Sequence, residues 1–390
     1  MPKTEKSHRM GQLEISNENT FIIDTLHLDH TPVRNLRVNF HFVNTEDSTH
    51  NFNQDSGRIF VHKLLHVMQI LFDKNDKMKL PIGNDIPVIP VNINYILTGQ
   101  KGGDGIYFHY DNALVYYNHM GARRNNSDYS VIEKYGIGTD SIINFFILPH
   151  DPDSVKSKTY QSGCVGIALG NAVKVAGIYE KGLNEWNVRG TFNHEVGHIL
   201  GLYHAWQDDG CDDTPIHAND CWADVSPGCE GRASNNMMDY NAWQSALTPC
   251  QLQIIHQHLS NPQQSVRKLL VPTWCVYNPA KKIIIKDSII WTFNRDLEGD
   301  IEIIKGGTLV LKGSVSMPDS AKVLVQPGGL LKLEGGYFHS ACGVDWGNIQ
   351  LVSKGKSMGK VVKVEAFKKE DPGPEVPAGS FRKKKIDLKN

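Results

Sequence analysis

The chain has 390 residues, of which 40% are hydrophobic, and a formal net charge of -1 at pH 7. This length is enough to bury a full core and predicts more than one domain. The near-neutral charge gives no steering towards nucleic acid or membranes, and no apolar run approaches the roughly 18 residues that span a bilayer. We therefore expect a protein that binds no nucleic acid and has no membrane span.

The first 34 residues are polar and weakly patterned, and their basic beginning is not followed by an apolar stretch. This pattern lacks the apolar core of a signal peptide. We interpret residues 1–34 as the remnant of a leader or a prosegment that precedes the first domain.

A strand and a helix are predicted next. Residues 36–43 alternate apolar and polar side chains, as a strand with one buried face does. Asp55 or Ser56 is expected to cap a helix that runs to about Phe72. Apolar residues recur along this helix at helical spacing, and the predicted buried stripe comprises Ile59, Phe60, Leu64, Val67, Met68 and Leu71.

Four further segments predict strands of the same sheet. The apolar runs at 93–97 and 142–148 are too short for helices and are typical of strands buried on both faces. Residues 164–169 and 172–179 also have strand character. One of these last two is expected to be the edge strand, where an extended peptide can add itself by main-chain hydrogen bonds.

Residues His194 to His204 read H-E-V-G-H-I-L-G-L-Y-H. Because two histidines four apart on a helix project from one face, His194 and His198 can bind one tetrahedral metal ion. Gly201 lacks a Cβ and can end the helix in a left-handed turn, which brings His204 from another direction as the third ligand. Glu195 then lies beside the open fourth position, where a general base for a bound water belongs. The run therefore predicts a zinc (Zn2+) site of the catalytic type.

The complete motif differs from a bare pair of histidines. His62 and His66 are also four apart, in H-K-L-L-H, but no glutamate follows the first and no third ligand exists, so we interpret them as helix surface. The helix of the complete motif is expected to begin near Thr191 or Asn193. The alternative for the motif, a set of satisfied surface and core histidines, does not account for its glutamate and glycine.

Residues 235–240, downstream of the histidines, read N-N-M-M-D-Y. The long histidine motif followed by a methionine turn is the signature of the metzincin metalloproteases. Within that group the chain resembles the pappalysin family. The matching pieces are the histidine motif, the D-T-P of residues 213–215 and N-x-M-D-Y, and the resemblance covers residues 35 to 262 approximately.

The resemblance implies roles for single residues. Met238 matches the methionine beneath the metal, whereas Met237 is expected to be an ordinary core methionine. Tyr240 matches the tyrosine near the zinc and is a candidate hydrogen-bond donor to the developing oxyanion. The implied reaction is hydrolysis of a peptide bond in a protein or peptide substrate, with Glu195 accepting a proton from metal-activated water.

Four cysteines bracket the loop after the zinc histidines and the methionine turn. Cys211, Cys221, Cys229 and Cys250 are close enough in sequence to predict two disulfides that staple an irregular, loop-rich lower half. The resemblance implies the pairs Cys211–Cys229 and Cys221–Cys250. A structural zinc site built from these thiols is the alternative, but the sequence contains no C-x-x-C pair.

The cysteine total also bears on the compartment. Because seven is odd, at least one of Cys164, Cys275 and Cys342 is expected to be free if the others pair within the chain. A disulfide framework predicts a secreted, extracellular protein. We expect an exported protein whose leader is not part of this chain.

An acidic stretch that contains Asp213 and Thr214 invites a calcium interpretation. Residues 208–213 include four aspartates. The resemblance implies Ca2+ near the D-T-P segment, with Asp213 and Thr214 as ligands. A solvated acidic loop is the alternative.

A last helix completes the predicted catalytic domain, which we place at residues 35–265. Thr248 and Pro249 open this helix, which is expected to run to about Leu259. The fold class is α+β: a metzincin-like domain with a mixed twisted sheet, long helices and an irregular lower half.

Residues 280–365 carry a repeat. Ile301-x-Ile303, Gly306-Gly307 and Leu309-x-Leu311 recur 22 residues later as Val323-x-Val325, Gly328-Gly329 and Leu331-x-Leu333. This period predicts rungs of a parallel β-solenoid, with degenerate rungs at 283–291 and 346–352. A small β-sandwich is the alternative. The domain has no ionisable cluster of catalytic type, so we expect it to serve in targeting, attachment or substrate engagement.

Residues 366–390 form the last segment of the chain. Prolines and glycines precede the basic run at 382–385. This composition predicts a disordered basic tail.

The leading function is therefore a secreted zinc endopeptidase. The alternative is a surface-attachment or binding protein whose β-repeat domain carries the function and whose zinc is structural. Structural zinc sites normally have four protein ligands, whereas this motif supplies three together with a general base. A zinc hydrolase acting on another acyl substrate is a third possibility that no sequence feature favours.

Overall fold

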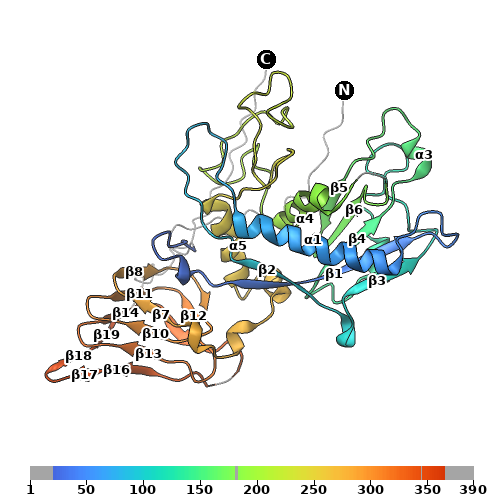
Figure 1. Cartoon of the computed structure of the whole chain (residues 1–390). Helices are drawn as coiled ribbons and strands as arrows, with labels where there is room; N and C mark the ends of the chain where they lie inside the picture. Colours follow the sequence, from blue (N-terminus) through green and yellow to red (C-terminus); the bar gives the residue numbers. More distant parts are fainter. Residues whose placement is uncertain (1–20, 181–182, 344, 365–390) are drawn as a thin grey trace, which may run out of the picture.

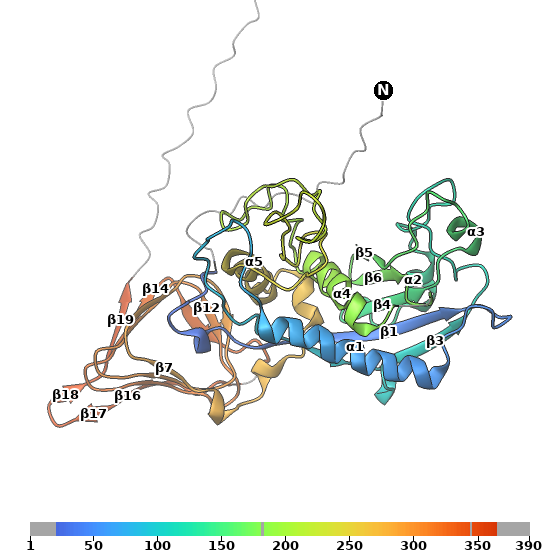
Figure 2. The ribbon, with the colours of Figure 1, turned by 45° about the horizontal axis from the view of Figure 1, so that its top comes forward.

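The computed structural model of the protein describes residues 21–180, 183–343 and 345–364. Most of the predicted leader or prosegment remnant, and all of the predicted basic tail, lie outside the described residues. The described chain forms an α/β body and an all-β body that lies beside it (Figure 1). In both views the all-β body is at one end of the α/β sheet, and helix α3 (Pro152–Val155) is at the other (Figures 1 and 2).

The α/β body is built on a sheet of six strands in the order β2-β1-β4-β6-β5, with β3 also paired to β1. The first part of β1 pairs with β2 and its last part with β3. All pairs are parallel except that of β5 with β6. The strands are β1 Arg34–Asn44, β2 Ile93–Leu97, β3 Ile106–Tyr110, β4 Ile143–Leu148, β5 Val165–Leu169 and β6 Ala172–Ala176. The edge strand expected at 164–169 or 172–179 is therefore β5.

Two long helices, α1 (Gln54–Lys74) and α4 (Glu185–Ile199), pack together on one face of the sheet. Phe40 of β1, Phe145 of β4 and Phe192 of α4 pack against one another between the sheet and α4, with ring centroids 4.9 to 6.3 Å apart. The short helix α2 (Ser130–Tyr135) contributes to a second apolar cluster on the opposite face. The site-bearing helix α4 is thus fixed to the sheet by aromatic packing.

The predicted helix α1 exists, but its first turn differs from the prediction. Asn53 is the N-cap, and its side chain accepts hydrogen bonds from the amides of Asp55 and Ser56, the residues predicted as caps. Ile59 was expected on the buried stripe and is 55% exposed. The reason is the rotation of the helix, which directs Gly57 and Phe60 at the sheet and leaves Ile59 outside.

The prediction for the start of α4 was also wrong. The helix begins at Glu185 rather than near Thr191 or Asn193. Asn184 caps it, and Asn187 completes a reciprocal capping box. The added first turns are anchored by Val188, which is fully buried.

Between α4 and α5 (Pro249–Ser260) the described chain contains no helix and no strand. This irregular segment, the predicted lower half of the domain, is drawn above α4 and α5 in the view of Figure 2. Thr248 caps α5 as predicted, and its side chain accepts a hydrogen bond from the amide of Gln251. The expected fold class, a mixed sheet with long helices and an irregular lower half, is confirmed.

The all-β body is a solenoid of three parallel sheets. Ile301 pairs with Val323 and Leu309 with Leu331, so both steps span the predicted 22 residues. The β-sandwich alternative is wrong, because the three sheets consist of parallel neighbours. The first sheet contains β7 Ile283–Ile285, β10 Ile301–Ile303, β13 Val323–Val325 and β16 Ile349–Leu351. The second contains β8 Ser288–Trp291, β11 Thr308–Leu311, β14 Leu330–Glu334 and β19 Lys360–Val364.

The third sheet was not predicted. It contains β9 Arg295–Asp296, β12 Ser314–Ser316 and β15 Tyr337–His339. These strands are too short to show an apolar alternation in the sequence. A short hairpin, β17 (Ser353–Lys354) with β18 (Ser357–Met358), projects from the last rung.

Several contacts join the solenoid to the α/β body. A disulfide links Cys275 to Cys342. Asp296 of β9 lies 3.0 Å from the guanidinium of Arg34 and accepts a hydrogen bond of 2.6 Å from Arg267. Short 3-10 helices occupy much of the connection and the segment before β1: η1 Leu28–His30, η3 Ser265–Leu269, η4 Thr273–Cys275 and η5 Pro279–Lys281. A further one, η2, lies at Gln100–Gly102 before β3.

In the described parts of the chain, no helix combines the length and the apolar composition needed to cross a bilayer.

Candidate metal centre

The structure brings the three predicted histidine ligands together. The Nε2 atom of His198 lies 3.1 Å from Nε2 of His194 and 3.1 Å from Nε2 of His204. His194 and His198 share one face of α4, and His204 follows the turn at Gly201, which has φ of 99°. A Cβ at Gly201 would lie 2.2 Å from Nδ1 of His258, so this turn requires glycine for its conformation and for its space.

The donor chemistry of these histidines fits a metal cation. Nδ1 of His194 donates to the carbonyl of Met237 (2.8 Å), and Nδ1 of His198 donates to the carbonyl of Leu202 (2.9 Å). Because a carbonyl only accepts, these bonds place the proton on Nδ1 and leave the Nε2 lone pair free. Lone pairs that converge at 3.1 Å repel unless they share a cation. Ligand atoms about 3.3 Å apart are expected around a tetrahedral zinc with bonds of about 2.0–2.1 Å.

Burial keeps these imidazoles neutral. The pKa of His194 is lowered to about 3, mainly by burial and also by the neighbouring His198 and His204, while the bond to Met237 opposes the shift. Burial also lowers the pKa of His204 to about 4. A neutral imidazole is the form that ligates metal.

Glu195 is buried between α4 and the edge strand β5. Burial raises the pKa of its carboxyl to about 7, and a hydrogen bond with the backbone of Ala168 opposes that shift. Gly166 of β5 lies directly over the carboxyl group: a Cβ there would be 2.8 Å from Cγ of Glu195. A glycine inside a predicted strand signals such a close approach, so Gly166 could have been found from the sequence.

Both predicted residues of the methionine turn lie beside the site. Met238 is fully buried, and its sulfur packs against Gly197 in the turn of α4 between the two histidine ligands. Tyr240 is 51% exposed, and its ring centroid lies 5.7 Å from that of His194 and 5.1 Å from that of His204. Met237 is also buried, as expected for a core residue.

Trp206 is a site residue that the sequence reasoning missed. Its ring stacks on His204 with centroids 4.0 Å apart and an interplanar angle of 16°. It also contacts Tyr240 at 4.5 Å. Trp206 therefore supports the one ligand that lies outside α4, and no motif in the sequence identifies this role.

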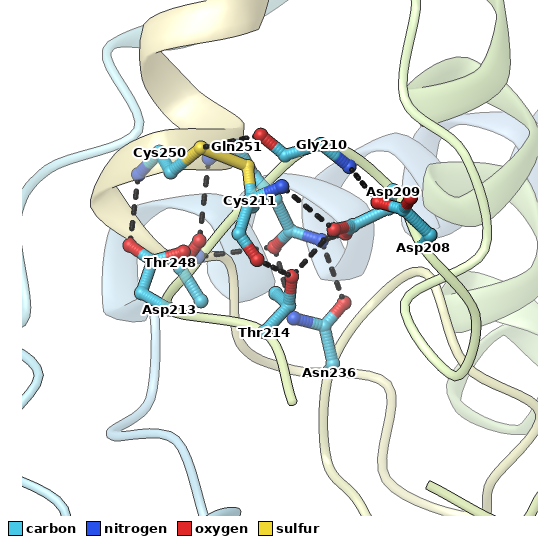
Figure 3. Close-up of a disulfide and its surroundings, with 10 residues drawn as sticks. All are labelled: Asp208, Asp209, Gly210, Cys211, Asp213, Thr214, Asn236, Thr248, Cys250 and Gln251. Carbon is cyan, nitrogen blue, oxygen red and sulfur yellow. Dashed lines mark hydrogen bonds between the residues drawn. A yellow bond between two sulfur atoms is a disulfide. The ribbon is translucent and has the colours of Figure 1, made fainter. Parts of the chain in front are cut away.

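The predicted disulfide pairing is wrong. The structure joins Cys211 to Cys250 and Cys221 to Cys229, with Cα separations of 5.6 and 5.5 Å. The cause is the position of α5: Cys250 lies in its first turn, where its amide donates to Oδ2 of Asp213 beside Cys211 (3.0 Å, Figure 3). Cys221 and Cys229 then close a local loop.

The remaining cysteines follow the prediction. Cys275 pairs with Cys342, and Cys164 has no disulfide. Burial raises the pKa of the Cys164 thiol to about 12, so it is protonated at neutral pH. His62 and His66 are both exposed on α1, as expected for helix surface.

In the acidic loop, Asp209 and one oxygen of Asp213 have protein hydrogen-bond partners. Thr214 donates from its hydroxyl to Oδ1 of Asp209 (2.6 Å), which also accepts from the amide of Cys211 (3.0 Å, Figure 3). Asp213 accepts from Cys250 through one oxygen, and its other oxygen is buried without a partner among the described residues. Calcium at Asp213 and Thr214 stays a prediction.

Comparisons with known proteins bear on this site. Residues 161–264 match the model of a family described as metallo-peptidase family M12B, reprolysin-like. No curated protein matches the chain. Solved structures of mirolysin are similar to it. One, in complex with a compound, has 16% identity and a TM-score of 0.42, and the match covers 62% of this chain and 96% of that chain. Mature Tannerella forsythia mirolysin with a cleaved peptide has 16% identity and a TM-score of 0.43, covering 61% and 96%.

The family match spans both the histidine motif and the methionine turn. With the converging histidines, that match identifies a metzincin-like metallopeptidase. The class of enzyme predicted from the histidine motif, a metalloendopeptidase, is confirmed.

Proposed function

We propose that the protein is a secreted zinc endopeptidase of the pappalysin type, with His194, His198 and His204 as zinc ligands and Glu195 as general base. The observation that carries this proposal is that the Nε2 atoms of the three histidines converge. In two of the rings, those of His194 and His198, the other nitrogen, Nδ1, is held by a hydrogen bond to a carbonyl. Among the described residues, no further histidine, cysteine or carboxylate joins this group. Zinc bound there would polarise the substrate carbonyl and acidify a water.

Glu195 is suited to moving the proton in this reaction. A carboxyl with a pKa of about 7 can take up a proton and release it near neutral pH. Burial also raises the pKa of Tyr240, with the charge of Glu195 as a smaller cause, so its hydroxyl stays protonated. Tyr240 would therefore be able to donate a hydrogen bond to an oxyanion beside His194 and His204.

The edge strand β5 is suited to hold a peptide substrate. It forms the end of the sheet, and Ala168 and Gly166 bring its backbone against Glu195. An extended peptide that added itself to the free edge would lie with its scissile bond beside the general base. We propose this mode of binding for a protein or peptide substrate.

Three disulfides support an extracellular location. We also propose that the solenoid serves in targeting or attachment. Comparing secretion and cell association of the full chain with those of a chain lacking the solenoid tests that role.

Digestion of casein by the full-length protein, with and without a chelator, tests the proposed activity. Glu195→Gln should keep the zinc content of the wild type and lose activity by more than roughly 100-fold. The matched control is Glu185→Gln at the first turn of the same helix, which should keep both. A metal-loaded Glu195→Gln variant with full activity would refute the role of Glu195.

A further inference from the structure

A second cluster of ligand-type side chains lies in the segment before β1. Asp24, His27 and His30 follow the spacing D-x-x-H-x-x-H and offer one donor atom each within 4.8 Å of one another. Oδ2 of Asp24 lies 2.8 Å from Nδ1 of His27 and 3.6 Å from Nδ1 of His30. These separations bracket the roughly 3.3 Å expected between ligand atoms around tetrahedral zinc. They also resemble the 3.1 Å separations of the catalytic histidines.

His30 is the unexplained member of this cluster. Its side chain is 1% exposed, and neither ring nitrogen has a hydrogen-bond partner among the described residues. A buried polar group without a partner is unfavourable and rare in native proteins. Since Nδ1 of His30 faces Oδ2 of Asp24, a cation bound between His30, His27 and Asp24 would satisfy that nitrogen.

His27 has the second partner that a metal ligand normally has. Its Nε2 lies 3.2 Å from Oδ2 of Asp287, in the turn between β7 and β8 of the solenoid. A metal-ligating histidine typically donates its other ring N–H to a carboxylate, which fixes the ring and makes it a stronger ligand. Asp24 and His27 thus have the arrangement of a ligand pair with an outer carboxylate supplied by the solenoid.

The charges around the cluster also admit a cation. Asp24, Asp29 and Asp287 contribute three carboxylates, and the nearby guanidinium of Arg295 contributes one positive charge. Arg295 is occupied with the backbone: it donates to the carbonyls of His30 (3.0 Å) and Ile22 (3.1 Å). Arg295 therefore holds the backbone of the N-terminal segment in place and does not occupy the side chains of Asp24, His27 and His30.

We propose that Asp24, His27 and His30 form a second divalent-metal site, separate from the catalytic centre, that fastens the N-terminal segment to the first rung of the solenoid. Its donors, two imidazoles and one carboxylate, suit zinc or a similar transition metal. The competing account is a metal-free cluster in which a protonated His27 bridges Asp24 and Asp287. That account leaves both ring nitrogens of His30 without a hydrogen-bond partner among the described residues.

Cobalt(II) titration of the full-length protein separates the two sites. In a His198→Ala/His204→Ala background, which removes the catalytic site, the protein should still bind one equivalent of cobalt with visible d–d absorption. Adding Asp24→Asn should abolish that binding, whereas the control Asp29→Asn, on an exposed acid of the same segment, should preserve it. Asp287→Asn should weaken the affinity by roughly 10–100-fold.

Zinc-dependent thermal stability provides a readout that does not depend on activity. Zinc should raise the melting temperature of the His198→Ala/His204→Ala protein, and it should have no such effect once Asp24→Asn is added. In chelator both proteins should melt alike, which shows that Asp24→Asn folds. Absence of cobalt binding in the first background, or binding that survives Asp24→Asn, would overturn the proposed site. Either result leaves the catalytic proposal untouched, because the wild-type catalytic site is assayed by digestion.

Discussion

The solenoid and the α/β body bury different kinds of side chain. In the solenoid the fully buried residues are mostly apolar and equivalent from rung to rung, as Leu309 and Leu331 are. In the α/β body many fully buried residues are polar, among them Asn144, Gln251 and His256, and each has its own partners. We infer that repetition makes solenoid positions interchangeable, whereas positions around the metal centre are individually required.

The largest effect of a single substitution is expected at Gly201, the glycine whose turn positions His204. Gly201→Ala should release zinc and reduce peptidase activity on the order of 100-fold or more, because its Cβ would displace His258 and tilt the third ligand. The control is Gly210→Ala, which shares the left-handed backbone (φ 83°) but has no atom within 4 Å of the added Cβ. Zinc content and digestion rate are the measurements. Equal losses in both variants would show that backbone strain rather than ligand delivery matters.

A cavity in the solenoid should affect stability but not catalysis. Leu309→Ala removes a fully buried side chain from the second sheet and should cost about 2–5 kcal/mol in unfolding free energy. The matched control Ile290→Ala, at a position that is 54% exposed, should cost far less. Denaturant unfolding gives the free energies, and zinc content measured below the transition should be unchanged. Loss of zinc in Leu309→Ala would show that packing inside the solenoid affects the metal centre.

The two disulfides of the lower half should differ in the stability they provide. Their sequence separations are 39 residues for Cys211–Cys250 and 8 residues for Cys221–Cys229. Loop-closure entropy then predicts losses of about 4 and about 2.5 kcal/mol on replacing each pair by serine. Thermal unfolding of the two double variants measures the difference. A larger loss for the short loop would show that native contacts, rather than chain entropy, dominate there.

Periodic parts of the fold were predictable, and parts set by distant contacts were not. The strand predicted at 93–97 is β2, and the 22-residue repeat is the register of the solenoid, because both depend on local sequence patterns. The disulfide partners depend on where α5 places Cys250, and no local pattern carries that information. The start of α4 was missed because its cap, Asn184, lies far from the histidine motif that drew the prediction.

The residues of the metal centre also fall into a group that the sequence predicts and a group that it does not. Its ligands share one helical turn and the bend after it, so the local motif, with its glutamate and glycine, brought His194, His198 and His204 together in the prediction. Trp206 reaches His204 through the fold of the irregular lower half, and the partnerless nitrogens of His30 are defined only by what surrounds them. Such features require the packed structure.

The smallest expected effect is the dependence of stability on pH. It also distinguishes the two bodies, because the fully buried histidines lie in the α/β body and none lies among the described residues of the solenoid. Burial lowers the pKa of His256 to about 4, while its bond to the carbonyl of Val91 opposes the shift. Below about pH 6.5 His256 becomes protonated in the unfolded chain but stays neutral in the folded protein. The free energy of unfolding should therefore fall by about 1–2 kcal/mol towards pH 5, and this group should not change it above pH 6.5. His256→Gln should reduce this slope in denaturant unfolding, whereas His62→Gln on the exposed face of α1 should leave it unchanged. An unaltered slope in His256→Gln would mean that other groups take up the proton.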